Sequence, residues 1–384
     1  MKKILIIHNT YRVTGGEDIA VENEIELLKK SYEIKVIKFD NGIKNYILQA
    51  LWFILNKNLK SISLVKNELS TFNPDYVYIH NTWFKVSLGI FKLLEDKKIK
   101  TILKIHNFRY FCTKSYLTKN HIFSHGYCEA CGLDSKSLGF FNKYFSDSIL
   151  RSFLINYYGK KYYKILKNNK IKILVLTDFH KKFMEDLGFN KNKVTVFRNF
   201  ISSNPNLSNT GLTPKKFLIY AGRISNEKGL QELIDSFCKV APKDFLLKII
   251  GTGPIINSLK EQGNANVEFL GSISNQEVLN QISNAKGVVT ATKLLEGQPT
   301  LLCEASSLGV PSIFPRTGGL REFFPEDYKF SFKQFDYSDL DEKLKLLISS
   351  DNTDTFGAES KLFIDKLLDE TSLITNFEDI LNEL

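Results

Sequence analysis

The sequence has few cysteines, few prolines and no long apolar run, and each shortage excludes a class of protein. Five cysteines in 384 residues are too few, and odd in number, for a fold held by disulfides. Nine prolines and 22 glycines exclude a collagen-like or broadly disordered chain. No apolar run reaches the roughly 18 residues that cross a bilayer, and the apolar stretch near the N-terminus is too short for a signal peptide. We therefore expect a globular protein that stays in the cytoplasm.

Charge is distributed unevenly along the chain. Residues 1–200 contain 34 basic and 17 acidic side chains, a net +17, whereas the remainder contains 18 and 25, a net −7. At roughly 100–200 residues per domain, the length predicts two domains, and the charge split indicates different electrostatic tasks for them. A basic half can face nucleic acid, an anionic membrane surface or a phosphorylated substrate, or its lysines can simply aid solubility. Charge alone leaves these alternatives open.

Short apolar runs that alternate with helical patterns predict an α/β fold. Each run is typical of a strand buried on both faces of a parallel sheet, and helices connect such strands by right-handed crossovers. The predicted strands of the first half are residues 3–8, 34–39, 76–80, 101–106, 171–176 and 194–197. Those of the second half are residues 217–221, 245–250, 267–270, 287–290 and 311–314, with helices at 230–240 and 276–285 among the connections.

The stretch 202–214 is rich in Ser, Thr, Asn and Pro and poor in apolar residues, which predicts a linker. We therefore expect a first domain over 1–200, a linker at 201–214 and a second domain over 215–360. The last stretch, 361–384, has a helical pattern and can pack on either domain, so the first domain can include it.

The most informative stretch is EGQPTLLCEA, residues 296–305, between a predicted strand and a predicted helix. Pro299 suits the first helical position. The N–H groups and dipole of a helix N-terminus bind phosphate, and carboxylates on either side can accept hydrogen bonds from hydroxyl groups. Glu296 and Glu304 then suit a nucleotide sugar, in which ribose and sugar flank a diphosphate. The alternative is a pair of solvated surface carboxylates.

A second stretch, GRISNEKG at 222–229, also follows a predicted strand. Arg223 and Lys228 can stabilise the charge on a departing diphosphate, although surface cations in a loop give the same pattern. Gly15 and Gly16 follow the first strand and allow close approach to phosphate, a weak signal. We interpret residues 251–254, Gly-Thr-Gly-Pro, as a turn.

Taken together, these residues resemble the retaining nucleotide-sugar glycosyltransferases of family 4 (glycosyl transferases group 1). The resemblance covers nearly the whole chain and includes His106 at a strand end and residues 317–319, Thr-Gly-Gly. It implies the GT-B architecture, two Rossmann-like doubly wound domains facing a central cleft. It also implies a C-terminal domain that binds the donor, an N-terminal domain that binds the acceptor, and no required cofactor or metal.

Roles follow from the resemblance, position by position. Glu304 would hold the donor ribose, Glu296 and the backbone after it the transferred sugar, and Arg223 and Lys228 the departing diphosphate. His106 would contact the transferred sugar near the reacting carbon, and the leaving phosphate would accept the acceptor's proton. The positions assigned to substrate binding are Gly15, Gly16, Gly222, Gly297, Thr300, Leu301 and Glu304. Gln298 and Pro299 stand where the family often has Phe-Gly, and Asn107 where many members have Asp, so the donor sugar stays open.

Three cysteines, Cys112, Cys128 and Cys131, form a cluster in the sequence with His121 and His125 between the first two. These residue types can supply tetrahedral zinc ligands. A redox-labile pair and unligated cysteines are the alternatives.

Residues 151–172 contain seven Lys or Arg and five aromatic residues, and residues 46–55 are apolar with Trp52 and Phe53. Both stretches suit docking on an anionic membrane. Helices packed in the first domain with their lysines outward are the alternative. Aromatic and basic residues together also suit single-stranded nucleic acid, but no nucleic-acid motif is present, and we expect no such partner.

We conclude from the sequence that the chain transfers a sugar from a nucleoside diphosphate, UDP or GDP, to a growing, lipid-linked glycan of bacterial surface type. We expect it in the cytoplasm, peripherally on the inner face of the membrane. The alternatives are a sugar-nucleotide epimerase or other enzyme of the same architecture, such as a phosphorylase, and a non-catalytic binding protein on this scaffold.

Overall fold

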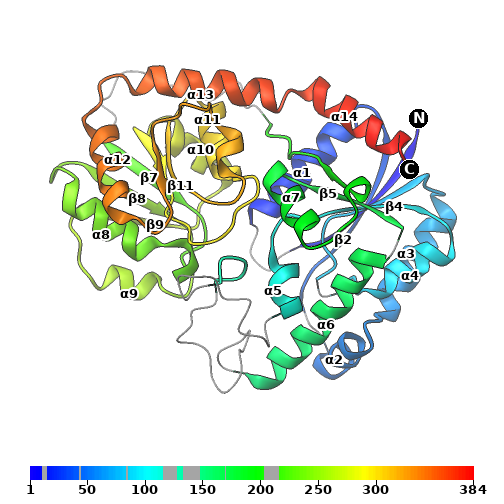
Figure 1. Ribbon diagram of the computed structural model, residues 1–384. Coiled ribbons are helices and arrows are strands. Elements are labelled where there is room, and N and C mark those ends of the chain that lie inside the picture. The colour runs from blue at the N-terminus through cyan, green and yellow to red at the C-terminus, as the bar shows by residue number, and fades with distance from the viewer. Residues whose placement is uncertain are drawn as a thin grey trace. The chain divides into compact units, whose positions relative to one another are not determined.

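The chain divides into two compact units in the computed structural model (Figure 1). The structure describes residues 1–10, 15–42, 45–83, 85–115, 128–132, 148–168, 170–202 and 216–384. Met1–Phe200 with Glu370–Leu384 form the N-terminal unit, and Ile201–Asp369 form the C-terminal unit. Each unit contains a six-stranded parallel sheet, which confirms the predicted α/β class with two parallel sheets.

The sheet of the N-terminal unit has the strand order β2-β1-β3-β4-β5-β6. Its strands are β1 (Lys3–Asn9), β2 (Glu33–Phe39), β3 (Tyr76–Ile79), β4 (Lys100–Lys104), β5 (Ile171–Val175) and β6 (Val194–Val196). The four residues at 4–7 are fully buried, because helices cover both faces of a central parallel strand. The chain moves from β1 to β2 on one side and then to β3 on the other, so the order reverses between β1 and β3.

The helices of this unit are α1 (Gly16–Leu28), α2 (Tyr46–Leu55), α3 (Leu59–Thr71), α4 (Gly89–Asp96), α5 (Arg109–Ser115), α6 (Ile149–Asn168), α7 (Asp178–Asp186) and α14 (Glu370–Asn382), with a 3-10 turn at Lys191–Lys193. The last helix, α14, returns to this unit, so both termini lie together (Figure 1). Phe377 on α14 packs against Tyr78 and Phe197, with ring centroids 5.5 and 5.2 Å away.

The sheet of the C-terminal unit has the order β12-β11-β10-β7-β8-β9. Its strands are β7 (Phe217–Ala221), β8 (Leu246–Ile250), β9 (Val267–Gly271), β10 (Gly287–Val289), β11 (Ser312–Arg316) and β12 (Ser331–Lys333). Its helices are α8 (Leu230–Val240), α9 (Ile256–Lys260), α10 (Asn275–Ser283), α11 (Thr300–Ser307), α12 (Tyr337–Ser349) and α13 (Thr353–Leu367), with 3-10 turns at Asn226–Lys228 and Leu320–Phe323. Here the order reverses between β7 and β10.

The structure divides the helical segment predicted at the end of the chain between the two units. The helical segment predicted at 361–384 is the end of α13 and the whole of α14, which belong to different units. The helix ends at Leu367 because the two parts bury their apolar side chains in different cores, Ile364 in the C-terminal unit and Phe377 in the N-terminal one. The predicted linker, beyond its first two residues, lies outside the described residues. Across the described parts of the chain, the helices are all too short or too polar to span a membrane.

Candidate functional site

The residues predicted to bind the donor gather at one edge of the C-terminal sheet. Arg223 and Lys228 follow β7, and Glu296 follows β10. These two strands are neighbours and flank the point where the strand order reverses. In open parallel sheets, ligands bind in the crevice outside the carboxyl ends of the strands at such a point. The topology therefore places all three side chains where this kind of sheet binds ligands.

Backbone contacts hold the loops of this edge together. The N–H of Lys293 donates to the carbonyl oxygen of Glu227 over 3.0 Å, which ties the loop after β10 to the loop after β7. Gly318, in the loop after β11, has φ 54°, and a Cβ there would lie 2.2 Å from the carbonyl oxygen of Glu296. The N–H of Gly319 donates to that same oxygen over 2.9 Å. Glycine is thus required at 318 for the backbone around Glu296 to be supported this closely.

The stretch 251–254 does more than turn the chain. Gly251 has φ 131°, and a Cβ there would lie 1.9 Å from the carbonyl oxygen of Gly222. The N–H of Gly222 in turn donates to Ile250 over 2.9 Å. The loop after β8 therefore packs backbone against backbone on the loop that carries Arg223. The position of Gly-Thr-Gly directly after a strand was the available signal, but only the pairing of β7 with β8 reveals the contact.

A short ion pair joins two of the predicted residues. Lys228 Nζ lies 2.6 Å from Glu296 Oε1, and Thr292 Oγ1 donates to the same carboxylate oxygen over 3.0 Å. About a quarter of each charged side chain is exposed. The guanidinium of Arg223 is more open, with 61% of the side chain exposed and Glu227 at 3.9 Å. The edge thus presents two cations, one of which is already positioned by a carboxylate.

Glu304 lies on the second turn of α11 and is buried. Burial raises the pKa of this carboxyl from 4.5 to about 7, against the opposing effect of a hydrogen bond with the Asn275 side chain. Pro299 is the N-cap of α11, one residue before the helical position that we predicted for it, because its ψ of 96° is extended rather than helical. Thr300 and Leu301 form the first turn, half-buried, and Gly297 is buried in the loop before them.

The second group of predicted residues lies at the carboxyl edge of the N-terminal sheet. His106, two residues beyond β4, has Nε2 3.2 Å from Nδ1 of His80, the residue directly after β3. The register pairs Ile7 with Ile79 on the neighbouring strand, so His8 of β1 lies level with His80. Sequence reasoning missed His8 and His80 as site residues. Both follow buried apolar runs, and carboxyl ends of parallel strands share an edge, which is the signal that could have found them.

Burial and nearby positive charge keep the imidazoles of His80 and His106 neutral. Burial lowers the pKa values of His80 and His106 well below 6.5, and the Lys104 ammonium lowers both further. Lys104 is itself fully buried and pairs with Glu24 of α1, which also accepts a hydrogen bond from the Tyr78 hydroxyl. Nδ1 of His106 and Nε2 of His80 are buried and have no hydrogen-bond partner among the described residues. A neutral imidazole with an unused nitrogen can bind a ligand hydroxyl.

Gly15 and Gly16 stand at the start of α1, beside this histidine group. Gly15 is the N-cap, and its N–H donates to Oδ2 of Asp18 over 2.9 Å, while Oδ1 of Asp18 lies 2.8 Å from Nε2 of His8. The N–H of Gly15 is therefore already used within the unit. Gly16 is exposed, so of the two glycines it is Gly16 that is predicted to approach a phosphate.

The two stretches predicted to dock on membrane form the helices α2 and α6, each of which carries exposed apolar side chains. Phe53 of α2 stacks on Tyr158 of α6, with ring centroids 5.4 Å apart, so the two helices pack together. Within the stretch 46–55, Trp52 and Phe53 are half-buried. The side chains that face outward from the two helices are Ile47, Leu51, Ile54, Leu55, Ile149, Leu150, Phe153 and Tyr157.

The chain was compared with protein families, with curated proteins and with solved structures. Residues 206–359 match the family model of glycosyl transferases group 1. The capsular polysaccharide biosynthesis glycosyltransferase CapM of Staphylococcus aureus is 27% identical over 256 residues, which cover 58% of this chain and 66% of that protein, just under two thirds of its length. Among solved structures, sucrose-phosphate synthase of Thermosynechococcus elongatus has a TM-score of 0.73 at 13% identity, over 100% of this chain and 99% of that one. Anabaena HepE in complex with UDP-glucose has a TM-score of 0.70 at 14% identity, over 100% of both chains.

The chain therefore carries, at residues 206–359, a domain of the glycosyl transferases group 1 type. Its architecture is that of the GT-B glycosyltransferases.

Proposed function

We propose that the chain transfers a sugar from a nucleoside diphosphate to a growing surface glycan and retains the anomeric configuration of the sugar. The observation that carries this proposal is the donor edge of the C-terminal unit. Two cations, the start of a helix and a buried carboxylate lie at the point where the strand order of a parallel sheet reverses. That point is where such sheets bind nucleotides.

The chemistry of the donor assigns the roles. The start of α11 and the cations Arg223 and Lys228 attract a diphosphate, and their charge stabilises it most as it leaves. Glu304 accepts hydrogen bonds from the ribose hydroxyls, which would offset the cost of burying its carboxylate. Glu296 and the backbone of Gly297 hold the transferred sugar, and the ion pair with Glu296 keeps Lys228 in place before the donor arrives.

Retention requires no protein nucleophile in this proposal. The departing phosphate accepts the proton of the acceptor hydroxyl, so no general base of the usual kind is assigned. His106 offers a neutral imidazole with an unused buried nitrogen, and it would bind a hydroxyl of the transferred sugar. The chemistry assigned to these side chains needs no cofactor or metal.

The names of similar proteins support the choice of substrates. HepE has been solved with UDP-glucose, and CapM is named for capsular polysaccharide biosynthesis. We propose UDP as the donor nucleotide, with GDP as the alternative for the test below, and a bacterial surface glycan as the acceptor.

A lipid-linked acceptor at the cytoplasmic face of the membrane is favoured by the apolar surface of α2 and α6. Its exposed side chains include Ile47, 78% exposed, and Leu150, 71% exposed. The exposed Lys160 and Lys164 lie further along α6, toward its C-terminal end. Apolar side chains beside basic ones suit the surface of an anionic bilayer, where each cation contributes about 1 kcal/mol. The N-terminal unit would then be the acceptor side of the enzyme and the C-terminal unit the donor side.

Titration calorimetry tests the donor site. We expect UDP to bind and Glu304→Ala to weaken its binding by about 1.5–3 kcal/mol, roughly 10- to 150-fold, because a charged acceptor of buried hydrogen bonds is lost. The exposed Glu268 on β9 supplies the control, and Glu268→Ala should bind as the wild type does. Equal affinity for UDP in wild type and in folded Glu304→Ala would remove Glu304 from the site. Binding of GDP in place of UDP would correct the base alone.

Co-sedimentation with vesicles tests the membrane surface. Wild type should sediment with vesicles rich in anionic lipid at low salt, less so at high salt, and not with neutral vesicles. Lys160→Glu with Lys164→Glu should abolish sedimentation, whereas the same reversals at the exposed Lys92 and Lys97 on and after α4 should have little effect. A wild type that ignores anionic vesicles at low salt would make a soluble acceptor the better choice.

A further inference from the structure

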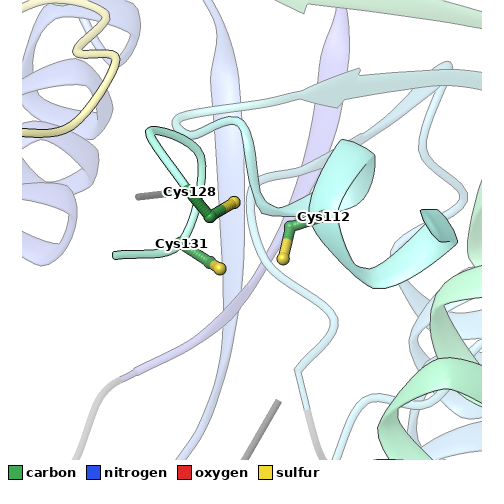
Figure 2. A group of neighbouring side chains, drawn as sticks. All are labelled: Cys112, Cys128 and Cys131. Atoms are coloured by element: carbon green, nitrogen blue, oxygen red, sulfur yellow. The ribbon is translucent and has the colours of Figure 1, made fainter. Parts of the chain in front are cut away.

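Three cysteines from two segments of the chain meet in the N-terminal unit. The sulfur atoms of Cys112, Cys128 and Cys131 all lie within 4.8 Å of one another. Cys112 comes from α5, and the other two come from the loop that faces it (Figure 2). Figure 2 shows the three side chains extending into one common space. Cys112 and Cys128 are fully buried, and Cys131 is half-buried.

The loop that carries Cys128 and Cys131 is a tight turn. The N–H of Gly132 donates to the carbonyl oxygen of Cys128 over 2.7 Å, and Gly132 has φ 78°, a conformation that favours glycine. The backbone N–H groups of Ala130 and Cys131 donate to the sulfur of Cys128. Donors aimed at a sulfur stabilise the thiolate form, which is the form that binds metal. The residues Cys-Glu-Ala-Cys-Gly thus form a turn in which both sulfurs lie on the side of α5.

A disulfide does not account for this arrangement. None of the five cysteines, all of which the structure describes, is in a disulfide. A disulfide joins two sulfurs at about 2.05 Å and leaves the third without a role, whereas here three sulfurs converge. Around a tetrahedral zinc ion with Zn–S bonds of about 2.3 Å, sulfur atoms lie about 3.8 Å apart. Sulfurs within 4.8 Å of one another reach that spacing by shifts of about 1 Å or less.

We infer that Cys112, Cys128 and Cys131 bind one structural zinc ion as thiolates, with a fourth ligand completing the tetrahedron. The ion clamps the loop at 128–132 onto α5, a helix of seven residues that is too short to be stable by itself. The turn that begins α5 follows directly after His106. The zinc ion therefore positions the segment that carries His106 and takes no part in the chemistry. His121 and His125, which the sequence placed beside these cysteines, lie outside the described residues.

Metal analysis of the full chain tests this inference. Protein expressed with added zinc and purified without chelator should contain about one zinc per chain, and Cys128→Ser should lose most of it. Cys238 is a half-buried cysteine on α8 of the other unit, so Cys238→Ser is the matched control and should keep its zinc. Equal zinc contents in Cys128→Ser and Cys238→Ser would overturn the inference.

Two measurements on the wild type remain valid if Cys128→Ser does not fold. X-ray absorption at the zinc edge should show three sulfur ligands at about 2.3 Å and one further ligand. Protein stripped of zinc and loaded with Co²⁺ should show thiolate-to-cobalt charge-transfer bands and the visible bands of a tetrahedral ion. A folded chain that takes up neither ion, or an unreduced Cys128–Cys131 disulfide found by peptide mass spectrometry, would overturn the site. Binding of UDP is measured in the same samples, so loss of the zinc site is distinguished from failure of the proposed donor site.

Discussion

The buried carboxyl of Glu304 destabilises the unliganded C-terminal unit in a way that depends on pH. Burial raises its pKa from 4.5 to about 7, so the folded unit holds this proton more tightly than the unfolded chain does. The stability that comes from this difference is complete below pH 4.5 and is lost as pH rises through 7. Glu304→Gln has no proton to lose. The variant should therefore exceed the wild type in stability by about 1 kcal/mol at pH 5 and by about 3 kcal/mol at pH 8.

Amide hydrogen exchange is the assay for this prediction. Both tryptophans, Trp52 and Trp83, lie in the N-terminal unit, so their fluorescence does not report on the C-terminal one. Exchange of peptides from β7 and β10 does report on it. Exchange rates are first corrected for their intrinsic dependence on pH. The ratio of protection in Glu304→Gln to protection in wild type should then rise by a factor on the order of 30 to 100 between pH 5 and pH 8, which corresponds to about 2 to 3 kcal/mol.

A matched control separates this effect from general effects of pH. Glu268→Gln removes an exposed carboxyl from β9 of the same unit, and its protection should follow that of the wild type at every pH. A ratio for Glu304→Gln that stays constant between pH 5 and pH 8 would refute the argument that burial of this carboxyl stores free energy at the site.

Three further predictions concern the remaining charged groups. Lys228→Ala should lower kcat by more than it raises KM, because the charge on the leaving diphosphate is greatest in the transition state; a change in KM alone, seen in steady-state kinetics, would contradict this. Glu24→Gln should lower the free energy of unfolding by about 3–5 kcal/mol, because it leaves the Lys104 ammonium buried without its partner. Urea unfolding followed by tryptophan fluorescence measures this loss. The double variant Glu24→Leu, Lys104→Met should regain most of the lost stability. The N-terminal unit should lose stability as pH falls from 7.5 to 5.5, measured by the same fluorescence assay, and a flat profile would be the contrary result. Burial lowers the pKa values of His80, His106 and His180 in the folded unit. The unfolded chain therefore binds protons at these three histidines below pH 6.5 that the folded unit does not bind, and this favours unfolding as pH falls.

The strands were predictable because central parallel strands are buried on both faces. Residues 4–7 form an unbroken apolar run for that reason, and the predicted strand at 3–8 is confirmed as β1. The segment 361–384 was harder, because its apolar pattern is helical throughout. Nothing local indicates that Ile364 and Phe377 enter different cores. The short strand β12 and the helix α3 also went unpredicted.

Site residues were predictable where a motif is local and were missed where pairing of distant strands creates the contact. Glu296 and Glu304 lie eight residues apart in one stretch, so a pattern exposes them. His80 contacts His106 only because β3 pairs with β4, and Gly251 contacts Gly222 only because β8 pairs with β7. Such contacts can be predicted from a sequence only after the order of its strands in the sheet is known.

The most direct test of the proposed function is proton NMR of a reaction of the full chain with UDP-sugars and GDP-sugars, with and without an added glycan acceptor. We expect one donor class to yield the free nucleoside diphosphate and a product whose anomeric proton shows the configuration of the donor. We also expect Glu304→Ala to slow that reaction strongly, while Glu268→Ala does not. A product of inverted configuration would contradict the retaining mechanism, and a folded chain that turns over no nucleotide sugar would contradict the proposed function as a whole.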